Sequence, residues 1–336
     1  MAIFDDANSA PEQEAPGVNE NLFGREESEG EPMDTEMLLT YCTLLCRKPS
    51  KLLVPAPTSP ELLIMLIVRP VTLLLLCLSV ISCSAIQPQH DGPRNNLLYA
   101  VAWQQTAAEY QALYYQGFNL ARLQVESAVE RRRNHDRPLA VISDLDATLL
   151  DAAEYWGYQV GRDTDFFDDV AWDAWIAENR LSATPGALEF LQFCAANSVE
   201  VFYVSNRDQG ENTDAYALAQ LEKLGFPYAD PDHVTILRES SNKQAIQEEI
   251  MAEYEVILLL GDNLNDFSRR YYVTDIEQRE RLMAEDRNAY GTQYILFPNP
   301  TDGHWIRAIY GDSEPPASAE NREILKRAAM RKIWQP

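Results

Sequence analysis

Two carboxylates, Asp144 and Asp146, follow directly after a short apolar run in the segment AVISDLDATLLD, residues 140–151. The run before them, Leu139–Ile142, has the branched and apolar residues of a buried strand. Two like charges at a buried strand end raise a pKa or require a cation between them, so they indicate chemistry. Their i, i+2 spacing lets both side chains face one crevice at the carboxyl edge of a sheet. One carboxylate could then attack an electrophile while the other moves protons.

Two further apolar runs, Val199–Val204 and Val256–Leu260, also predict strands that end in polar residues of catalytic types. The carboxyl ends of parallel strands meet at one edge of a sheet, so these residues are expected to lie together. The residues brought to this edge are Asp144, Asp146, Ser205, Asn206, Asp262 and Asp266, with Lys243 at the start of the helix before the last strand.

This set of residues suits a phosphoryl group bound beside a divalent ion. Four carboxylates would repel a phosphate, and a hard cation among them would remove the repulsion; donors that are all oxygen favour Mg²⁺. Ser205, Asn206 and Lys243 would then bind the phosphoryl oxygens, with Lys243 offsetting their charge. Taken singly, a helix cap, a solvated lysine and a turn aspartate are ordinary alternatives. Only the order of the residues along the chain favours a site.

Composition excludes several other classes of protein. The formal net charge of −24 argues against a nucleic acid polymer as partner. The four histidines lie at no metal-ligand spacing from one another. The cysteines Cys42 and Cys46 are separated by three residues, so they do not form a CxxC redox motif, and no second pair follows to complete a zinc site.

The N-terminal quarter has the sequence features of an export signal and lacks those of a folded domain. Residues 1–64 are predicted to be disordered or a spurious extension, since the first part is acidic and poor in large apolar groups. Residues 65–82 have the length and apolarity of a signal peptide, with Arg69 as the positive charge. They end in Val-Ile-Ser-Cys, which resembles a bacterial lipobox in which Cys83 is acylated. An internal anchor helix is the alternative. Residues 83–94 would form a polar tether.

The rest of the chain alternates apolar strands with helices, which predicts an α/β fold with a doubly wound parallel sheet and a small helical subdomain. A long helix is expected over Asn95–Arg133, and the aromatic-rich residues 152–183 would form an insert over the first strand end. Thr184 would cap a helix with Pro185 as its first residue. The remaining predictions are a helix over Thr213–Leu224 and strands over Val234–Leu237 and Tyr294–Phe297.

The motif D-x-D-x-T and the three later strand ends resemble the haloacid dehalogenase superfamily. Within it, the sequence is similar to the bacterial class C acid phosphatases of the lipoprotein e type over residues 95–309. The segments that carry this resemblance are DLDATLLDAAEYWGYQV, TPGALEFLQF, VFYVSNR, LGF, GDNLNDF and FPNP. The resemblance implies an acid phosphatase domain over residues 95–312, followed by a C-terminal tail or helix over 313–336. It also implies Mg²⁺, and phosphomonoester substrates that include 5′-nucleotides.

The resemblance also implies roles for particular residues. Asp144 would be the nucleophile that forms an aspartyl-phosphate, and Asp146 the general acid/base. Asp144, the backbone carbonyl of Asp146, and Asp262 would hold the metal, with Asp266 ordering its waters. This chain departs from the family at Ala147, where Glu is usual, and at Asn265, where Asp is usual. Neither is a primary catalytic position, but metal affinity and the pH profile could differ.

Aromatic residues on both sides of the crevice could select the substrate. The resemblance points to Tyr158 and Tyr272 as a clamp for a flat base, and packing of the insert is the alternative. The prediction for the whole chain is a phosphomonoesterase of the bacterial cell envelope, anchored through Cys83. A phosphatase for other small phosphates, or a catalytically silent binding or storage lipoprotein, remain alternatives. A silent protein would have no need of both Asp144 and Asp146.

Overall fold

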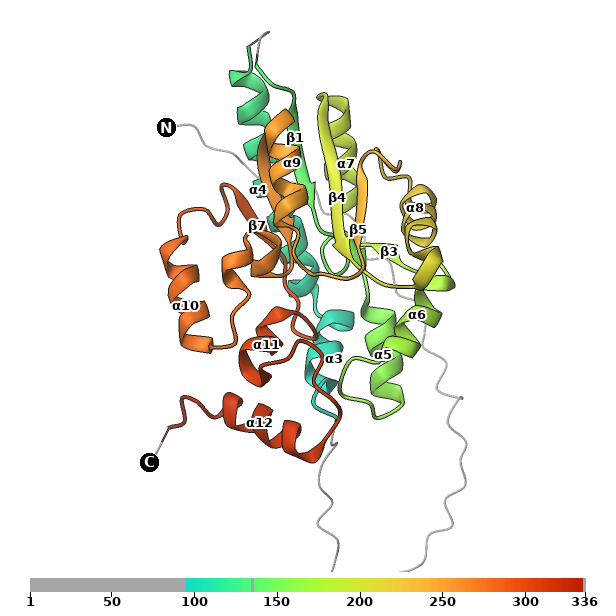
Figure 1. Cartoon of the computed structure of the whole chain (residues 1–336), viewed down its shortest axis with the longest axis vertical. Helices are drawn as coiled ribbons and strands as arrows, with labels where there is room; N and C mark the ends of the chain where they lie inside the picture. Colours follow the sequence, from blue (N-terminus) through green and yellow to red (C-terminus); the bar gives the residue numbers. More distant parts are fainter. Residues whose placement is uncertain (1–94, 134–135, 335–336) are drawn as a thin grey trace, which may run out of the picture. The chain divides into compact units, whose positions relative to one another are not determined.

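The computed structural model describes residues 95–133 and 136–334, all of which belong to one compact unit (Figure 1). The predictions for residues 1–64, the signal peptide, Cys83 and the tether lie outside these described residues. Within them, no helix is both long enough and apolar enough to cross a membrane.

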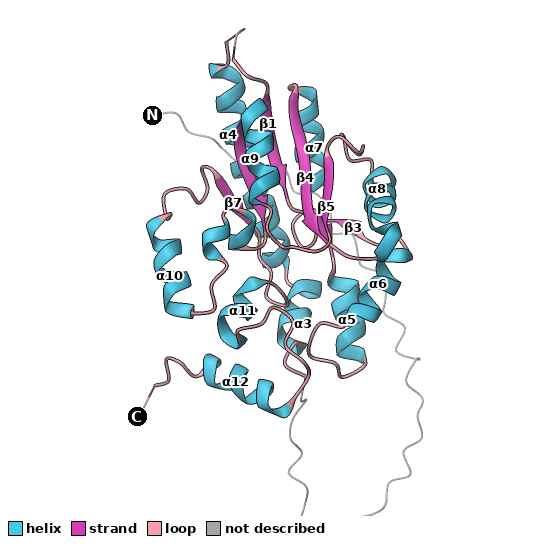
Figure 2. Ribbon diagram, in the orientation of Figure 1, coloured by secondary structure: helices cyan, strands magenta, loops and turns pink. Residues whose placement is uncertain are grey.

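A parallel five-stranded sheet lies at the centre of the unit, in the order β5-β4-β1-β6-β7 (Figure 2). The strands are β1 (Leu139–Ser143), β4 (Val199–Asn206), β5 (Val234–Leu237), β6 (Glu255–Gly261) and β7 (Tyr294–Leu296). Every residue of β1 is buried, as expected for the middle strand of a covered sheet. The predicted α/β class with a parallel sheet is therefore confirmed.

Helices cover both faces of this sheet because successive strand residues point to opposite sides. On one face, Val141 and Val201 pack in the main core with α4 (Ala108–Arg131), α7 (Ala187–Ala196) and α8 (Thr213–Leu224). On the other face, Ile142 and Phe202 form a second core with α9 (Gln244–Glu253). The sheet is therefore doubly wound.

The predicted long N-terminal helix is wrong in one respect, since it is divided into α3 (Leu98–Thr106) and α4. Ala107 is extended, with φ −83° and ψ 123°, and its N–H donates to the carbonyl of Trp103. The two helices have different neighbours: α3 packs against the insert, and α4 packs against α7 and the sheet. A local periodicity cannot show that the two halves of a segment pack against different partners.

The insert is a small helical subdomain, as predicted. It contains α5 (Ala153–Gly161) and α6 (Asp169–Ala177), and a two-stranded ladder of β2 (Leu150–Asp151) and β3 (Ser182–Ala183) joins it to the core. Its aromatic rings pack on one another, with Tyr155 at 4.9 Å from Trp156 and 5.0 Å from Trp172 between ring centroids. Most of these rings therefore form the subdomain's own core.

The predicted cap at Thr184 is wrong. Helix α7 begins at Ala187, and Gly186 before it has φ +87°, a left-handed conformation that no helical residue adopts. Pro185 and Gly186 therefore form a turn instead of the first helical residues. The Thr184 hydroxyl donates to the carbonyl of Thr148 at 2.9 Å, and this bond ties the end of the insert to the loop after β1.

The C-terminal part adds helices that complete the unit. The predicted helix over Thr213–Leu224 is confirmed as α8, and Gly225, with φ +70°, ends it. Three further helices are α10 (Ile276–Glu285), α11 (His304–Tyr310) and α12 (Ala319–Ala329). The last of these is the helix expected within residues 313–336. In Figure 1, α11 and α12 lie below the carboxyl edge of the sheet, together with α3 and α5.

Candidate active site

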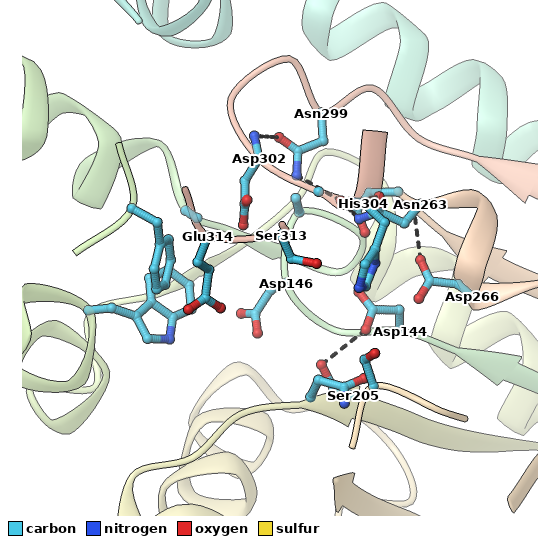
Figure 3. Close-up of a pocket in the computed structure, with 18 of the residues that line it drawn as sticks. Asp144, Asp146, Ser205, Asn263, Asp266, Asn299, Asp302, His304, Ser313 and Glu314 are labelled. Atoms are coloured by element: carbon cyan, nitrogen blue, oxygen red, sulfur yellow. Dashed lines mark hydrogen bonds between the residues drawn. The ribbon is translucent and has the colours of Figure 1, made fainter. Parts of the chain in front are cut away.

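A cavity of about 340 Å³ opens at the carboxyl edge of the sheet (Figure 3). In the sheet register, Ser143 stands beside both Tyr203 and Leu260, so the residues that follow β1, β4 and β6 emerge at one level. All seven residues that the sequence placed at this edge line the cavity: Asp144, Asp146, Ser205, Asn206, Lys243, Asp262 and Asp266.

Asp144 is held in a single orientation at the centre of this cavity. Its backbone N–H continues the ladder of the sheet by donating to the carbonyl of Leu260. Its carboxylate is buried and accepts hydrogen bonds on both oxygens: Ser205 Oγ and Lys243 Nζ donate to Oδ1 at 3.0 and 2.5 Å, and Thr148 Oγ1 donates to Oδ2 at 3.2 Å. Thr148 is the threonine of the D-x-D-x-T motif, and this contact explains its place there.

Lys243 connects two of the carboxylates. It lies one residue before α9, is 6% exposed, and donates to Asp144 Oδ1 and to Asp266 Oδ1, the latter at 2.7 Å. Burial alone would lower the pKa of this ammonium group, but the flanking Asp144 and Asp266 raise it above its ordinary value. Lys243 therefore remains charged in a buried site and can offset negative charge there.

Three carboxylates are arranged to share a metal ion. Asp144, Asp262 and Asp266 can each present an oxygen so that the three oxygens lie within 4.8 Å of one another. Burial and the neighbouring Asp266 and Asp144 raise the pKa of Asp262 well above its ordinary value. Burial also raises the pKa of Asp266 to about 6, against the opposing effect of Lys243. A divalent cation would offset this repulsion, so the residues present fit a hard metal with oxygen ligands.

The loop after β6 holds its two aspartates in place. Asp262 Oδ2 accepts from Asn263 Nδ2 at 2.9 Å and from Asn299 Nδ2 at 2.7 Å. Asp266 Oδ2 accepts from the backbone N–H of Asn263 at 2.9 Å. A Cβ on Gly261 would lie 2.5 Å from Asp266 Cβ, so only glycine lets the loop fold back this closely. Asn299 belongs to the FPNP segment, to which the sequence assigned no role.

The two departures from the family pattern differ in their position. Asn265 lies outside the cavity, and its Oδ1 accepts a hydrogen bond from Arg279 on α10 at 3.0 Å. Ala147 lines the cavity and has φ +55°, an uncommon conformation for a residue with a side chain. In this chain, the small residue Ala147 therefore adopts the left-handed conformation of the turn after Asp146.

Asp146 has a buried partner that sequence reasoning missed. Arg207 donates hydrogen bonds to both carboxylate oxygens of Asp146, from Nε to Oδ2 and from Nη2 to Oδ1, each at 2.6 Å. The guanidinium is 1% exposed, and its Nη1 donates to Gln220 Oε1 on α8 at 2.6 Å. The only available signal was the arginine directly after Ser205-Asn206, at the end of the VFYVSNR segment.

The two tyrosines predicted to clamp a base behave differently. Tyr272 lines the cavity, and the guanidinium groups of Arg269 and Arg307 lie 3.5 and 4.2 Å from the centroid of its ring. Tyr158 does not line the cavity; it is 53% exposed, and its hydroxyl accepts a hydrogen bond from Arg162. Trp156 lines the cavity instead. Residues two positions apart on a helix differ in direction by about 200°. Because Trp156 on α5 faces the cavity, Tyr158 points away from it.

The other wall of the cavity combines three rings of the insert, which the sequence placed over the first strand end, with residues to which it assigned no role. They are aromatic or acidic for the most part: Trp156, Phe167, Trp172, Asp302, His304, Ser313 and Glu314. Burial raises the pKa of Asp302 to about 6, with a further contribution from Asp146. Burial and nearby cations, first Arg279 and then Lys243, lower the pKa of His304 to about 4. His304 is therefore a neutral side chain at this site.

Comparison with known proteins agrees with this geometry. A family model described as HAD superfamily, subfamily IIIB (Acid phosphatase), matches residues 82–305, well over half of the chain. The chain belongs to this family. Its fold is thus the haloacid dehalogenase α/β core, and it is a phosphomonoesterase, as the sequence predicted.

Two solved structures support the assignment to class C. The class C acid phosphatase from Bacillus anthracis has 28% sequence identity and a TM-score of 0.66, with 73% of this chain and 99% of that chain covered. The same enzyme with tungstate bound matches with 28% identity and a TM-score of 0.65, over 72% of this chain and 98% of that chain.

Proposed function

We propose that this acid phosphatase transfers the phosphoryl group of its substrate to Asp144 with Mg²⁺ bound, and that 5′-nucleotides are among its substrates. The observation that carries the proposal is the setting of Asp144. Its carboxylate is buried and fixed by three donors, next to two further aspartates with which it can share a cation. A carboxylate held in this way is oriented for one attack.

The first step transfers the phosphoryl group to the enzyme. An oxygen of Asp144 attacks phosphorus, the bond from phosphorus to the leaving-group oxygen breaks, and Asp146 gives that oxygen a proton. Ser205 and Lys243, which donate to Asp144 in this structure, are close enough to donate to the phosphoryl oxygens instead. Asn206 lines the cavity beside them. These donors offset the charge that develops in the transition state.

The second step releases phosphate. A water molecule attacks phosphorus, the bond to Asp144 breaks, and Asp146 takes the proton that the water loses. Asp144, Asp262 and Asp266 provide side-chain oxygens for Mg²⁺, to which the family resemblance adds the backbone carbonyl of Asp146. When bound, the ion would supply positive charge against the phosphate and the three carboxylates. The B. anthracis relative was solved with tungstate, a tetrahedral oxyanion like phosphate.

The hydrolysis of p-nitrophenyl phosphate by the purified enzyme tests this proposal. We expect activity that EDTA removes and Mg²⁺ restores. Asp144→Asn should abolish turnover, because an amide does not attack phosphorus. The matched control is Asp232→Asn, an exposed residue outside the cavity, which should leave the rate unchanged. Activity that resists EDTA, or an active Asp144→Asn enzyme, would contradict the proposal. Absence of turnover would favour the silent lipoprotein.

Nucleotide binding is proposed from the ring of Tyr272. Tyr272 lines the cavity, and a base would stack on its ring in place of one of the guanidinium groups of Arg269 and Arg307. Stacking on such a ring contributes roughly 1–3 kcal/mol per base in nucleic-acid sites. Tyr272→Ala should therefore raise KM for AMP about tenfold or more, with little change for p-nitrophenyl phosphate.

Tyr158→Ala is the matched control, since Tyr158 lies outside the cavity and should change neither KM. An equal effect of Tyr272→Ala on both substrates, together with a lower melting temperature, would mean that Tyr272 only packs. A panel of nucleotides and sugar phosphates separates a nucleotidase from a phosphatase for other small phosphates.

The proposed location is the bacterial cell envelope, through a lipid on Cys83. Its support is the sequence of residues 65–83 alone. A lipoprotein carries more than one acyl chain, which stable anchoring requires. We expect the mature chain to begin at Cys83 and to partition into detergent. Mass spectrometry that finds an unmodified Cys83 within a longer chain would support the internal anchor instead.

A further inference from the structure

The C-terminal segment 311–318, between α11 and α12, reaches into the active-site cavity. Ser313 and Glu314 line the same cavity as Asp144 and Asp146, and Figure 3 shows both side chains among the residues that surround it. The family match ends at residue 305, so this segment lies beyond the matched residues.

An ion pair with a buried carboxylate holds this segment in place. Arg322 on α12 donates to both oxygens of Asp165 in the insert, at 2.9 and 2.8 Å. The Asp165 carboxylate is 1% exposed and also accepts a hydrogen bond from Asn96 Nδ2 at 2.8 Å. Pro315 is buried, and the side chain of Ser318 caps α12. Glu314 is therefore held at the cavity by a docked helix and does not belong to a free tail.

The surroundings of Glu314 combine aromatic rings with negative charge. Phe167 and Trp172 line the cavity with it, and the same three residues line an adjoining hollow of about 280 Å³, to which Arg207 and Arg238 also contribute. Figure 3 shows the carboxylate of Glu314 and that of Asp302 in the same wall of the cavity. Burial raises the pKa of Glu314, and among the described residues the charged groups that contribute most to this rise are the carboxylates of Asp169, Asp302 and Asp312.

An aromatic surface beside an unpaired carboxylate attracts an organic cation. The ring faces attract positive charge, a carboxylate adds a direct electrostatic attraction, and an anion at the same place would be repelled. In an acid phosphatase the part of the substrate that meets this wall is the leaving group, because the phosphoryl group is held at Asp144.

We propose that Glu314 is a specificity-determining residue that favours phosphomonoesters whose leaving group carries an ammonium cation over those with a neutral or anionic leaving group. This inference rests on the proposed function, since it assumes that the phosphoryl group is bound at Asp144. It adds a substrate class, the aminoalkyl phosphates, selected by a segment outside the family match.

A pair of substrates that differ only in charge tests the proposal. Phosphocholine and 3,3-dimethylbutyl phosphate have the same shape, but the first carries a quaternary nitrogen where the second carries carbon. We would measure kcat/KM for both, and the inhibition constant of each against p-nitrophenyl phosphate, so that binding is read even without hydrolysis. The wild-type enzyme should prefer phosphocholine by about tenfold, the size expected for a cation at a partly desolvated aromatic site.

Two variants then assign the preference to Glu314. Glu314→Gln should reduce the ratio to about twofold, because the rings remain and the charge is lost. Glu320→Gln, on the exposed first turn of α12, is the matched control and should keep the wild-type ratio. Glu314→Lys should reverse the charge preference, so that 3-phosphoglycerate, whose leaving group is anionic, is favoured over phosphocholine.

The outcomes separate this inference from the proposed function. If p-nitrophenyl phosphate is not hydrolysed, the proposed function fails and the inference fails with it. If it is hydrolysed but the wild-type ratio is one or less, only the inference is wrong. An equal ratio in the wild type and in Glu314→Gln would likewise overturn the role of Glu314.

Discussion

At the scale of single residues, the two carboxylates of the D-x-D motif have different surroundings. Asp144 is bound by a lysine, a serine and a threonine, whereas both oxygens of Asp146 are bound by Arg207. Asp144 thus lies with Asp262 and Asp266 around the candidate metal site, and Asp146 is bound from the side of β4 and α8. The two carboxylates are therefore held by different neighbours, in keeping with the separate roles proposed for them.

Replacing Asp146 should reduce the rate of hydrolysis by an amount that depends on the leaving group of the substrate. Asp146→Asn should reduce kcat about 10²–10⁴-fold, the usual contribution of a general acid/base. The loss should be smaller for p-nitrophenyl phosphate than for AMP, because nitrophenolate leaves without a proton. Parallel kinetics on the two substrates provide the check, and an equal loss on both would remove the acid/base role from Asp146.

Arg207 should act through Asp146. Lysine has no planar fork and cannot reproduce two parallel bonds to one carboxylate. Arg207→Lys should therefore lower kcat for AMP about tenfold or more, and the loss for p-nitrophenyl phosphate should be smaller, as for Asp146→Asn.

A double variant shows whether the two residues share one function. When Asp146→Asn is already present, Arg207→Lys should add little further loss, since residues that act together are not additive. A full additional loss in the double variant would show that Arg207 acts on something other than Asp146. Unchanged leaving-group dependence in Arg207→Lys would show that it only stabilises the fold.

At the scale of elements, the loop between β7 and α11 positions the metal-binding loop after β6. Gly303 has φ +123°, and a Cβ there would lie 2.4 Å from Asn263 Oδ1 and 2.7 Å from Asn263 Nδ2. Asn263 in turn donates to Asp262 and accepts from the backbone N–H of His304. The close approach of the two loops therefore depends on a glycine.

Gly303→Ala should consequently affect both stability and metal binding. The backbone strain should cost about 1–3 kcal/mol, visible as a lower melting temperature, and the displaced Asn263 should raise the Mg²⁺ concentration needed for half-maximal activity. Gly311→Ala is the matched control, because Gly311 has φ +81° but open space around its Cβ position. It should lower stability without a change in Mg²⁺ requirement. The same Mg²⁺ requirement in both variants would contradict the role of the loop contact.

The elements also show which features the sequence could predict. The strand ends could be predicted because each apolar run stops at a polar residue, and a parallel sheet leaves them little freedom in where they meet. The break at Ala107 and the contact of Arg207 with Asp146 depend on partners that are distant along the chain. No local pattern carries that information.

The error at Tyr158 has a different origin. The resemblance implies Tyr158 as one side of a clamp, but helix α5 presents Trp156 to the cavity and Tyr158 to solvent. The acidic part of the opposite wall was missed for a further reason. Ser313 and Glu314 come from the C-terminal segment, which the sequence described only as a tail or helix.

At the scale of the whole molecule, the acidic cluster links stability to pH and to the metal. Burial raises the pKa of Asp266 from 3.8 to about 6, and that of Asp262 rises as well. A carboxyl group with a higher pKa in the folded protein binds its proton more tightly when folded. The contribution of these groups to the stability of the folded protein therefore falls as pH rises from about 4 to about 6. At lower pH, a metal ion that binds must displace their protons.

Mg²⁺ should therefore stabilise the protein more at about pH 7.5 than at about pH 5. We expect a rise in melting temperature of several degrees at the higher pH and a much smaller one at the lower pH. The low pKa of His304, about 4, lowers stability in acid, but it does so with and without Mg²⁺ and cancels in the difference. Asp262→Asn should remove the Mg²⁺ effect at both pH values. An equal rise at both pH values would contradict this assignment of the metal site.

The central claim is that Asp144 carries the phosphoryl group during turnover, and trapping that intermediate tests it most directly. Enzyme in steady-state turnover of p-nitrophenyl phosphate would be quenched in acid and treated with borohydride, which reduces an acyl phosphate to an alcohol. Peptide mass spectrometry would then find homoserine at position 144, and none in Asp144→Asn. Homoserine at position 146, or an unmodified Asp144 in an enzyme caught during turnover, would contradict the account.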